Sequence, residues 1–173
     1  GVLMVAHFVI TWAFLPLYPY LVRIVMLIPN LGFPVAGILV AAAFGGAATF
    51  ALHRLLLQRF GPVGALSGAM FFCFGPMSYL FLVDYADSTF VFFIFCSLIL
   101  MLQRRWLLMI PFAVAASFAH PGAVALASAI GLDCLVHMVR RDPTFLVREK
   151  VGAGAAIIVI TLAGFGWPII AGL

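Results

Sequence analysis

The sequence predicts an all-α, polytopic transmembrane protein with about five to six membrane helices and a possible interfacial helix. Hydrophobic residues make up 66% of the chain, charged residues make up 8%, and the mean hydropathy is +1.28. A soluble domain is only about half apolar and about a quarter charged. The apolar runs extend along the whole chain, so a signal peptide does not account for them. The expected solvent is therefore a lipid bilayer.

The apolar runs predict the membrane helices. A helix needs about 20 apolar residues to cross a hydrocarbon core about 30 Å thick. The chain begins at Gly1 and both of its ends lie in apolar sequence, so we expect residues 1–173 to form one transmembrane domain of a longer chain. Charged residues, prolines and glycines bound the predicted spans, which are 33–57, 62–83, 88–103, 106–119, 122–139 and 151–172.

Two of these spans are short. At about 1.5 Å per residue, the span 106–119 reaches only ~21 Å and the span 88–103 only ~24 Å. Either polar residues are drawn into the helices, or the ends near Asp87 and His120 stop below the membrane surface in a recessed polar cavity. The alternative is that both loops reach the interface and are solvated there.

The segment 1–29 has two interpretations. Proline fixes φ and lacks a backbone donor, so a regular helix is expected to begin near Pro19. A helix over 19–29 is too short to span and would lie in the interface, with Tyr18 and Tyr20 at headgroup level. The alternative is one kinked span over 2–29.

The basic residues predict orientation. Arg54 with Arg59, Arg104 with Arg105, and the loop 140–150 alternate with loops at 30–34, 84–87 and 120–122 that are poor in Arg and Lys. Placing the basic groups on the cytoplasmic side makes every span consistent. The formal charge of +4 therefore indicates membrane topology rather than a nucleic-acid partner.

Arg23 is the one basic residue on the opposite side in this arrangement. It could bind a lipid phosphate, pair with Asp84 or Asp87, or extend to the headgroups.

A polar cluster at the predicted start of a helix contains the candidate site residues Asp84, Tyr85, Asp87 and Ser88. These include two of only five acidic residues. Asp87 or Ser88 could cap the helix that follows, and an Asp there complements the helix dipole. Capping explains one acid but not two, so we also expect a carboxylate to face a cavity and orient a sugar, a hydroxyl or a basic partner. His120 is either structural or a donor to phosphate or sugar.

Other chemistries find no support in the sequence. The three cysteines lie inside apolar runs without CxxC spacing, so we expect neither a zinc site nor a disulfide framework. We find no P-loop, no HExxH and no serine-hydrolase elbow, and we expect no metal or cofactor. Glycines and alanines at 41–48 give the predicted helix 33–57 a small-residue face suited to close helix packing.

Four segments occur in the order of one enzyme family. They are AFLPLYPYLVRIV, LHRLLLQRFG, GPMSYLFLVDYADSTFVFFIFCSLIL and FAHPGAV, which lie within residues 13–126. Together they resemble the GPI mannosyltransferase 2 (PIG-V) family, which belongs to the GT-C glycosyltransferases. Matching positions in the third segment are Pro76, Ser78, Tyr85, Asp87, Ser88 and Phe90, and in the fourth Pro121 and Gly122.

The resemblance implies a GT-C-like fold and mannose transfer from dolichyl- or polyprenyl-phosphate mannose to a lipid-linked, GPI-type acceptor. The site would lie on the lumenal or outer face of the endoplasmic reticulum membrane in a eukaryote, or of the plasma membrane in a bacterium. The implied substrate-binding residues are Asp84, Tyr85, Asp87, Ser88 and His120, together with Arg23 and Tyr18.

Three departures from the family pattern matter. Asp87 stands where Glu is usual, and His120 stands at or beside the usual Arg. The family's catalytic acid belongs to the first lumenal loop, but residues 1–12 contain no Asp or Glu. That acid is expected upstream in a longer chain, or the chain is not an active transferase. The competing interpretations are a lipid or solute transporter and a non-catalytic membrane subunit that binds a lipid or a partner subunit.

Overall fold

The computed structural model describes residues 16–75, 86–140 and 147–172. Within these ranges the chain is helical, with no strand, which confirms the all-α prediction. The helices are α2 (Leu17–Val25), α3 (Phe33–Leu57), α4 (Pro62–Phe74), α5 (Asp87–Leu102), α6 (Trp106–Ala119), α7 (Val124–Val139) and α8 (Val147–Gly172), with the 3-10 turn η2 (Pro121–Ala123) before α7.

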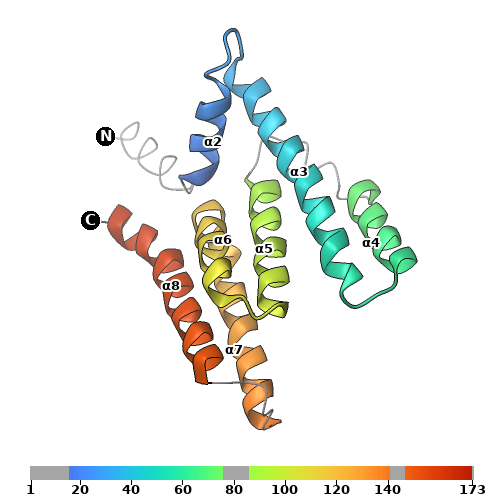
Figure 1. The fold of residues 1–173 in the computed structure, drawn as a ribbon. Coiled ribbons are helices and arrows are strands. Elements are labelled where there is room, and N and C mark those ends of the chain that lie inside the picture. The colour runs from blue at the N-terminus through green and yellow to red at the C-terminus, as the bar shows by residue number, and fades with distance from the viewer. Residues whose placement is uncertain (1–15, 76–85, 141–146, 173) are drawn as a thin grey trace.

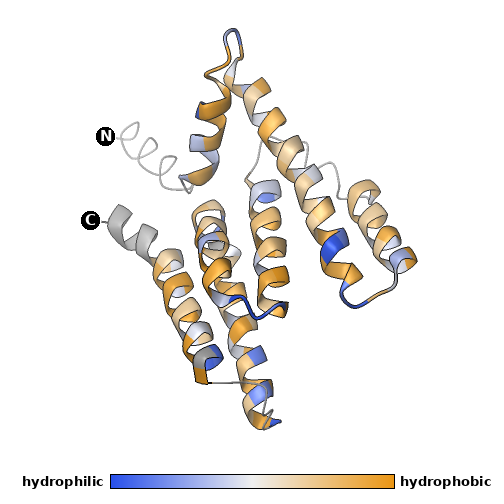
Figure 2. Ribbon diagram, viewed as in Figure 1, coloured by the Kyte–Doolittle hydropathy of each residue, from blue (hydrophilic) through white to orange (hydrophobic). Residues whose placement is uncertain are grey.

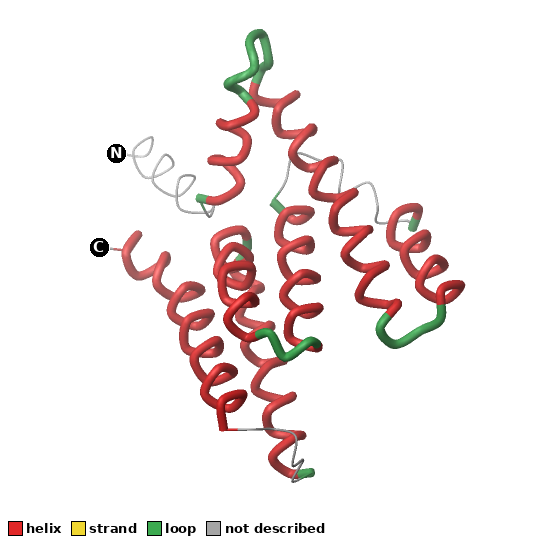
Figure 3. Tube along the Cα trace, viewed as in Figure 1, coloured by secondary structure: helices red, strands yellow, loops and turns green. Residues whose placement is uncertain are grey.

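Consecutive helices from α3 to α8 run in alternating directions, as Figure 1 shows. α5 packs against α3 on one side and α6 on the other, α4 packs on α3, and α8 packs on α6 and α7. The green loops of Figure 3 therefore gather at two ends of the bundle. One end holds the loop between α5 and α6, and the other holds the turn between α6 and α7.

Proline and glycine set several helix ends as the sequence predicts. α3 and α4 each begin after an extended glycine, Gly32 and Gly61, with a proline in the first turn. Proline suits that position because the first N–H groups of a helix have no partner inside it. The bounds of α3 and α6 match the predicted spans, and those of α5 match to within one residue.

The predicted span 62–83 is not one continuous helix. α4 ends at Phe74, and Gly75 is extended, with φ −67° and ψ 164°. Gly75 precedes Pro76, and a residue before proline is disfavoured in helical conformation. The remainder of that span, 76–83, falls outside the described residues.

Three other boundaries differ from prediction. α2 begins at Leu17, two residues before Pro19, and ends at Val25, so one helix continuing to residue 29 is wrong. α7 begins at Val124 after the η2 turn, and α8 begins at Val147, four residues earlier than predicted.

The end of α5 forms a Schellman motif. The Arg104 N–H donates to the Met101 carbonyl at 2.9 Å, and the Arg105 N–H donates to the Leu100 carbonyl at 2.9 Å. Arg104 has φ 55°, a left-handed conformation that glycine usually supplies at this position. A side chain there costs about 1–2 kcal/mol, so the surrounding contacts must hold Arg104 in place.

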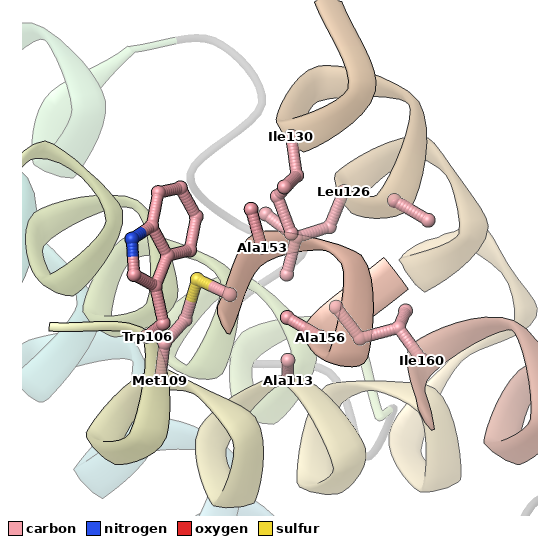
Figure 4. Packing of buried hydrophobic residues seen from close by; sticks show 9 residues of the cluster. Trp106, Met109, Ala113, Leu126, Ile130, Ala153, Ala156 and Ile160 are labelled. Carbon is pink, nitrogen blue, oxygen red and sulfur yellow. The ribbon is translucent and has the colours of Figure 1, made fainter. Parts of the chain in front are cut away.

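The interior is built mainly of small residues, and many of the large apolar residues point outward. Most of the fully buried hydrophobic residues are alanines, whereas Phe71 is 80% exposed, Phe74 77% and Leu107 74%. A larger cluster joins α6, α7 and α8 around Trp106, Met109 and Ile130, with Ala113, Leu126, Ala153, Ala156 and Ile160 (Figure 4). A smaller cluster joins Tyr18 and Val22 of α2 to Ala36 and Val40 of α3.

Within the described ranges, α3 is the one helix both long enough and apolar enough to cross a membrane. α4, α5, α6 and α7 are apolar but shorter, with 10–17 residues.

Candidate functional site

Two segments about 30 residues apart meet at the α6–α7 end of the bundle. Phe90, in the first turn of α5, lies with its ring centroid 4.9 Å from that of His120, which ends α6. A Cβ at Gly122 would lie 2.9 Å from His120 Nδ1 and 3.3 Å from Phe90 Cζ. The start of α5 and the His120–Gly122 turn are therefore in close contact, and their residues form the candidate site.

Asp87 is the first residue of α5 rather than its cap. Ala86 occupies the N-cap position, and no side chain makes a capping hydrogen bond there. The prediction that Asp87 or Ser88 occupies the N-cap position is wrong, because α5 begins at Asp87 and both residues lie inside its first turn. The half-buried Asp87 carboxylate still complements the positive end of the helix dipole.

Two adjacent hydroxyls beside Asp87 are buried without a hydrogen-bond partner. Ser88 is 1% exposed and Thr89 is fully buried, and neither Oγ atom is paired. Elsewhere the hydroxyls of Thr49, Ser97, Ser117, Ser128 and Thr161 donate to the carbonyl four residues earlier.

Ser88 and Thr89 cannot do the same within α5, because the carbonyls four residues before them precede the helix. An unpaired buried donor costs about 1–3 kcal/mol, so these hydroxyls are candidates to bind a ligand. Thr89 is not among the site residues predicted from the sequence, although its place in the first turn beside Ser88 was a usable signal.

His120 has a defined tautomer in this arrangement. The Gly122 N–H donates to His120 Nδ1 at 2.9 Å. A neutral imidazole whose Nδ1 accepts carries its proton on Nε2. His120 Nε2 is therefore a donor, which suits a phosphate or sugar oxygen.

An apolar groove of about 190 Å³ begins at this contact. Phe90, Ile94 and Leu98 line one wall at intervals of four residues along α5. Gly122, Ala125, Leu126 and Ala129 line the other wall, from the turn into α7. The polar residues at the start of α5 therefore adjoin a narrow hydrocarbon-lined space.

Of the other predicted site residues, Tyr18 belongs to a cluster that packs against Ala86 at the start of α5. Tyr18 is 6% exposed, and its hydroxyl donates to the Gly37 carbonyl at 3.1 Å. This bond and the packing of α2 on α3 hold the ring between the two helices, and its place at headgroup level stays a prediction. Tyr20 is 61% exposed, which is compatible with its predicted place at headgroup level. Asp84 and Tyr85 lie outside the described residues.

Arg23 is exposed in the last turn of α2. A cation there complements the negative end of the helix dipole. Among the described residues no ion pair joins it to Asp87.

Of the predicted site residues, the structure brings Asp87, Ser88 and His120 to one end of the bundle.

In the part of the chain that the structure describes, no three His, Cys, Asp or Glu side chains gather in a way that could hold a metal ion.

Comparison with known proteins adds no relative. No family model matches the sequence, and no curated protein or solved structure matches it.

Proposed function

We propose that the chain is a polytopic membrane mannosyltransferase, and that its sugar-lipid site includes the start of α5 and the His120 turn. The donor would be dolichyl- or polyprenyl-phosphate mannose, and the acceptor a lipid-linked sugar of the GPI type. The observation that carries the proposal is the contact between two of the four family-like segments, which gathers Asp87, His120 and two unpaired buried hydroxyls.

The distribution of side chains supports insertion into a membrane. Large apolar residues are exposed on α3, α7 and α8, including Phe50 at 61%, Leu132 at 62% and Leu162 at 66%. Such a surface is unfavourable in water and favourable in lipid. Alanine and glycine instead occupy the helix contacts, as is common where helices pack inside a bilayer.

The two ends of the bundle differ in the way the topology requires. Figure 2 shows hydrophilic residues at the end of α3, at the loop between α5 and α6, and at the end of α7. These are the places of Arg54, Arg104, Arg105 and Arg140. The candidate site lies at the opposite end, which in this proposal faces the lumen or the exterior because the basic residues favour the cytoplasm.

The reaction requires few groups from this end of the bundle. The mannosyl phosphate already carries a good leaving group, so the enzyme must position the acceptor hydroxyl, stabilise the departing phosphate and exclude water. Asp87 is suited to accept a hydrogen bond from an acceptor hydroxyl, and His120 Nε2 to donate one to phosphate. In the family that the sequence resembles, the catalytic acid that removes the acceptor proton lies in the first lumenal loop, so we assign that role to no residue gathered here.

The test is transfer of labelled mannose from polyprenyl-phosphate mannose in membranes that carry the full chain. Asp87→Asn removes the charge and keeps the shape, so we expect loss of transfer with normal amounts of protein in the membrane. Asp133→Asn is the matched control, because this acid lies on α7 beside His137, 3.7 Å away, and should leave transfer unchanged.

The outcomes separate the functional classes. Full transfer by Asp87→Asn would remove Asp87 from the site. If none of the proteins transfers mannose although all are inserted and GPI-type acceptors have been supplied, the non-catalytic subunit and the transporter become the better interpretations.

A further inference from the structure

A second cavity lies at the basic end of the bundle, away from the candidate site. It has a volume of about 700 Å³ and lies between the start of α6 and the start of α8. Arg104, Arg105 and Trp106 line it from the α5–α6 loop and α6, and Glu149 and Val151 line it from α8. Charged and apolar side chains line the same pocket, so its lining is suited to an amphiphilic ligand.

The loop that forms this pocket is held in an unfavourable backbone conformation. Arg104 has the left-handed φ of 55° that glycine normally supplies. Its guanidinium donates to Glu149 Oε2 at 2.7 Å, which ties the loop to α8. This ion pair and the Schellman hydrogen bonds at the end of α5 maintain that conformation. The ion pair also neutralises Glu149, which is the only acidic residue among the described residues that line the pocket.

Hydrogen-bond donors remain in excess around the cavity. Trp106 is 5% exposed and its indole Nε1 is buried without a partner. α6 begins at Trp106 with no side-chain cap, so its first N–H groups are left free by the helix. Arg105 is exposed beside them. Free amides, a positive helix end and an arginine together favour an anion with several oxygens.

Exposed apolar residues of both α6 and α8 also line the pocket. Leu107 is 74% exposed, Leu108 54% and Val151 67%, and all three line the cavity. A free inorganic anion would leave these side chains uncovered. A molecule with a phosphate and attached hydrocarbon chains would cover both the polar and the apolar lining residues.

We propose that this pocket binds an anionic phospholipid, with its phosphate at Arg105 and the start of α6, and its acyl chains along Leu107, Leu108 and Val151. The proposal rests on the membrane insertion included in the proposed function, but not on mannose transfer. The basic end is the end predicted to meet the cytoplasmic leaflet, where anionic lipids are concentrated.

The experiment measures quenching of tryptophan fluorescence by brominated lipids in nanodiscs that hold the full chain. Trp12 and Trp167, and any tryptophan in the rest of the chain, are replaced by Phe so that Trp106 is the reporter. Brominated phosphatidylglycerol or brominated phosphatidylcholine is then mixed into unlabelled phosphatidylcholine over the same series of mole fractions. We expect phosphatidylglycerol to quench Trp106 at a several-fold lower mole fraction than phosphatidylcholine.

Matched variants locate the effect. Arg105→Gln should reduce the preference for phosphatidylglycerol by about fivefold, which corresponds to the ~1 kcal/mol that one arginine contributes at an anionic surface. Arg59→Gln changes an exposed arginine at the same end of the bundle, outside the pocket, and should keep the preference. Ala155→Phe places a larger side chain in the pocket from an exposed position on α8, without changing the charge. This variant should also reduce the preference for phosphatidylglycerol.

Three results would overturn the proposal. Equal quenching by the two lipids would show no selective site. An equal loss of the preference for phosphatidylglycerol in Arg105→Gln and Arg59→Gln would show general attraction of anionic lipid to a charged surface. Recovery of fluorescence on adding inorganic phosphate would show a pocket for free phosphate rather than for a lipid. Because quenching by either lipid reports insertion, these results do not depend on the transferase assay.

Discussion

At the scale of single residues, Gly122 determines the shape of the candidate site. Its backbone N–H holds His120 Nδ1 at 2.9 Å, and its missing side chain leaves room for the rings of His120 and Phe90. Glycine is required here for space rather than for an unusual backbone conformation, since Gly122 lacks a positive φ. The defined donor at His120 Nε2 therefore depends on a neighbour that carries no functional group.

Gly122→Ala should displace the His120 ring and destabilise the protein by about 1–3 kcal/mol, the usual cost of overpacking. The expected readouts are a lower midpoint of thermal unfolding in detergent and reduced mannose transfer. Gly131→Ala in α7 is the control, because a Cβ there meets nothing within 4 Å and should be neutral or stabilising. Equal stability of the two variants would contradict the packing described at Gly122.

At the scale of helices, small residues set how closely the elements approach. The predicted small-residue face of α3 is confirmed in part: Ala41, Gly45 and Ala48 are buried, but Gly46 is exposed. Helical periodicity explains the difference, because only residues three or four apart share one face. A similar close approach joins α6 to α8, where a Cβ at Gly152 would lie 3.0–3.1 Å from three atoms of Trp106.

Gly152→Ala should therefore loosen the contact between α6 and α8 and lower the free energy of unfolding by about 1–3 kcal/mol. Gly154→Ala, two residues along the same helix, meets nothing within 4 Å and provides the comparison. Unfolding of both variants in a denaturing detergent titration measures the difference. If the Gly152→Ala and Gly154→Ala proteins unfold at the same detergent concentration, α8 can move away from Trp106 at little cost in free energy.

At the scale of the whole molecule, alternating helices place the α2–α3 loop and the α3–α4 loop at opposite ends. Asn30 and Arg59 lie in these loops, and both residues are exposed. If the bundle spans the membrane with its basic end in the cytoplasm, position 30 faces the lumen or the exterior and position 59 faces the cytoplasm.

Single-cysteine reporters test this topology. In a background without Cys73, Cys96, Cys134 or any cysteine from the rest of the chain, Asn30→Cys and Arg59→Cys should react with a membrane-impermeant maleimide from opposite sides of sealed vesicles. Labelling of both positions from one side would exclude a membrane-spanning α3, whatever the outcome of the transferase assay.

The sequence by itself determined the class of structure and many helix ends. The high apolar content predicts helices in a membrane, and the regular interruptions by Pro, Gly and Arg predict where those helices end. Both signals are local in the sequence, so they do not require knowledge of which helices are in contact. α3 and α6 accordingly match their predicted bounds. The composition also predicted which ends of the helices carry charge.

Only the tertiary structure decided which residues share a site. The burial of Tyr18, the unpaired hydroxyl of Thr89 and the contact of Phe90 with His120 each depend on how separate helices pack. So does the pocket that the Arg104–Glu149 ion pair closes across 45 residues of sequence. Hydropathy states how much a residue favours lipid or water, but in a chain that is apolar on almost every helix face it cannot state which face meets a neighbour.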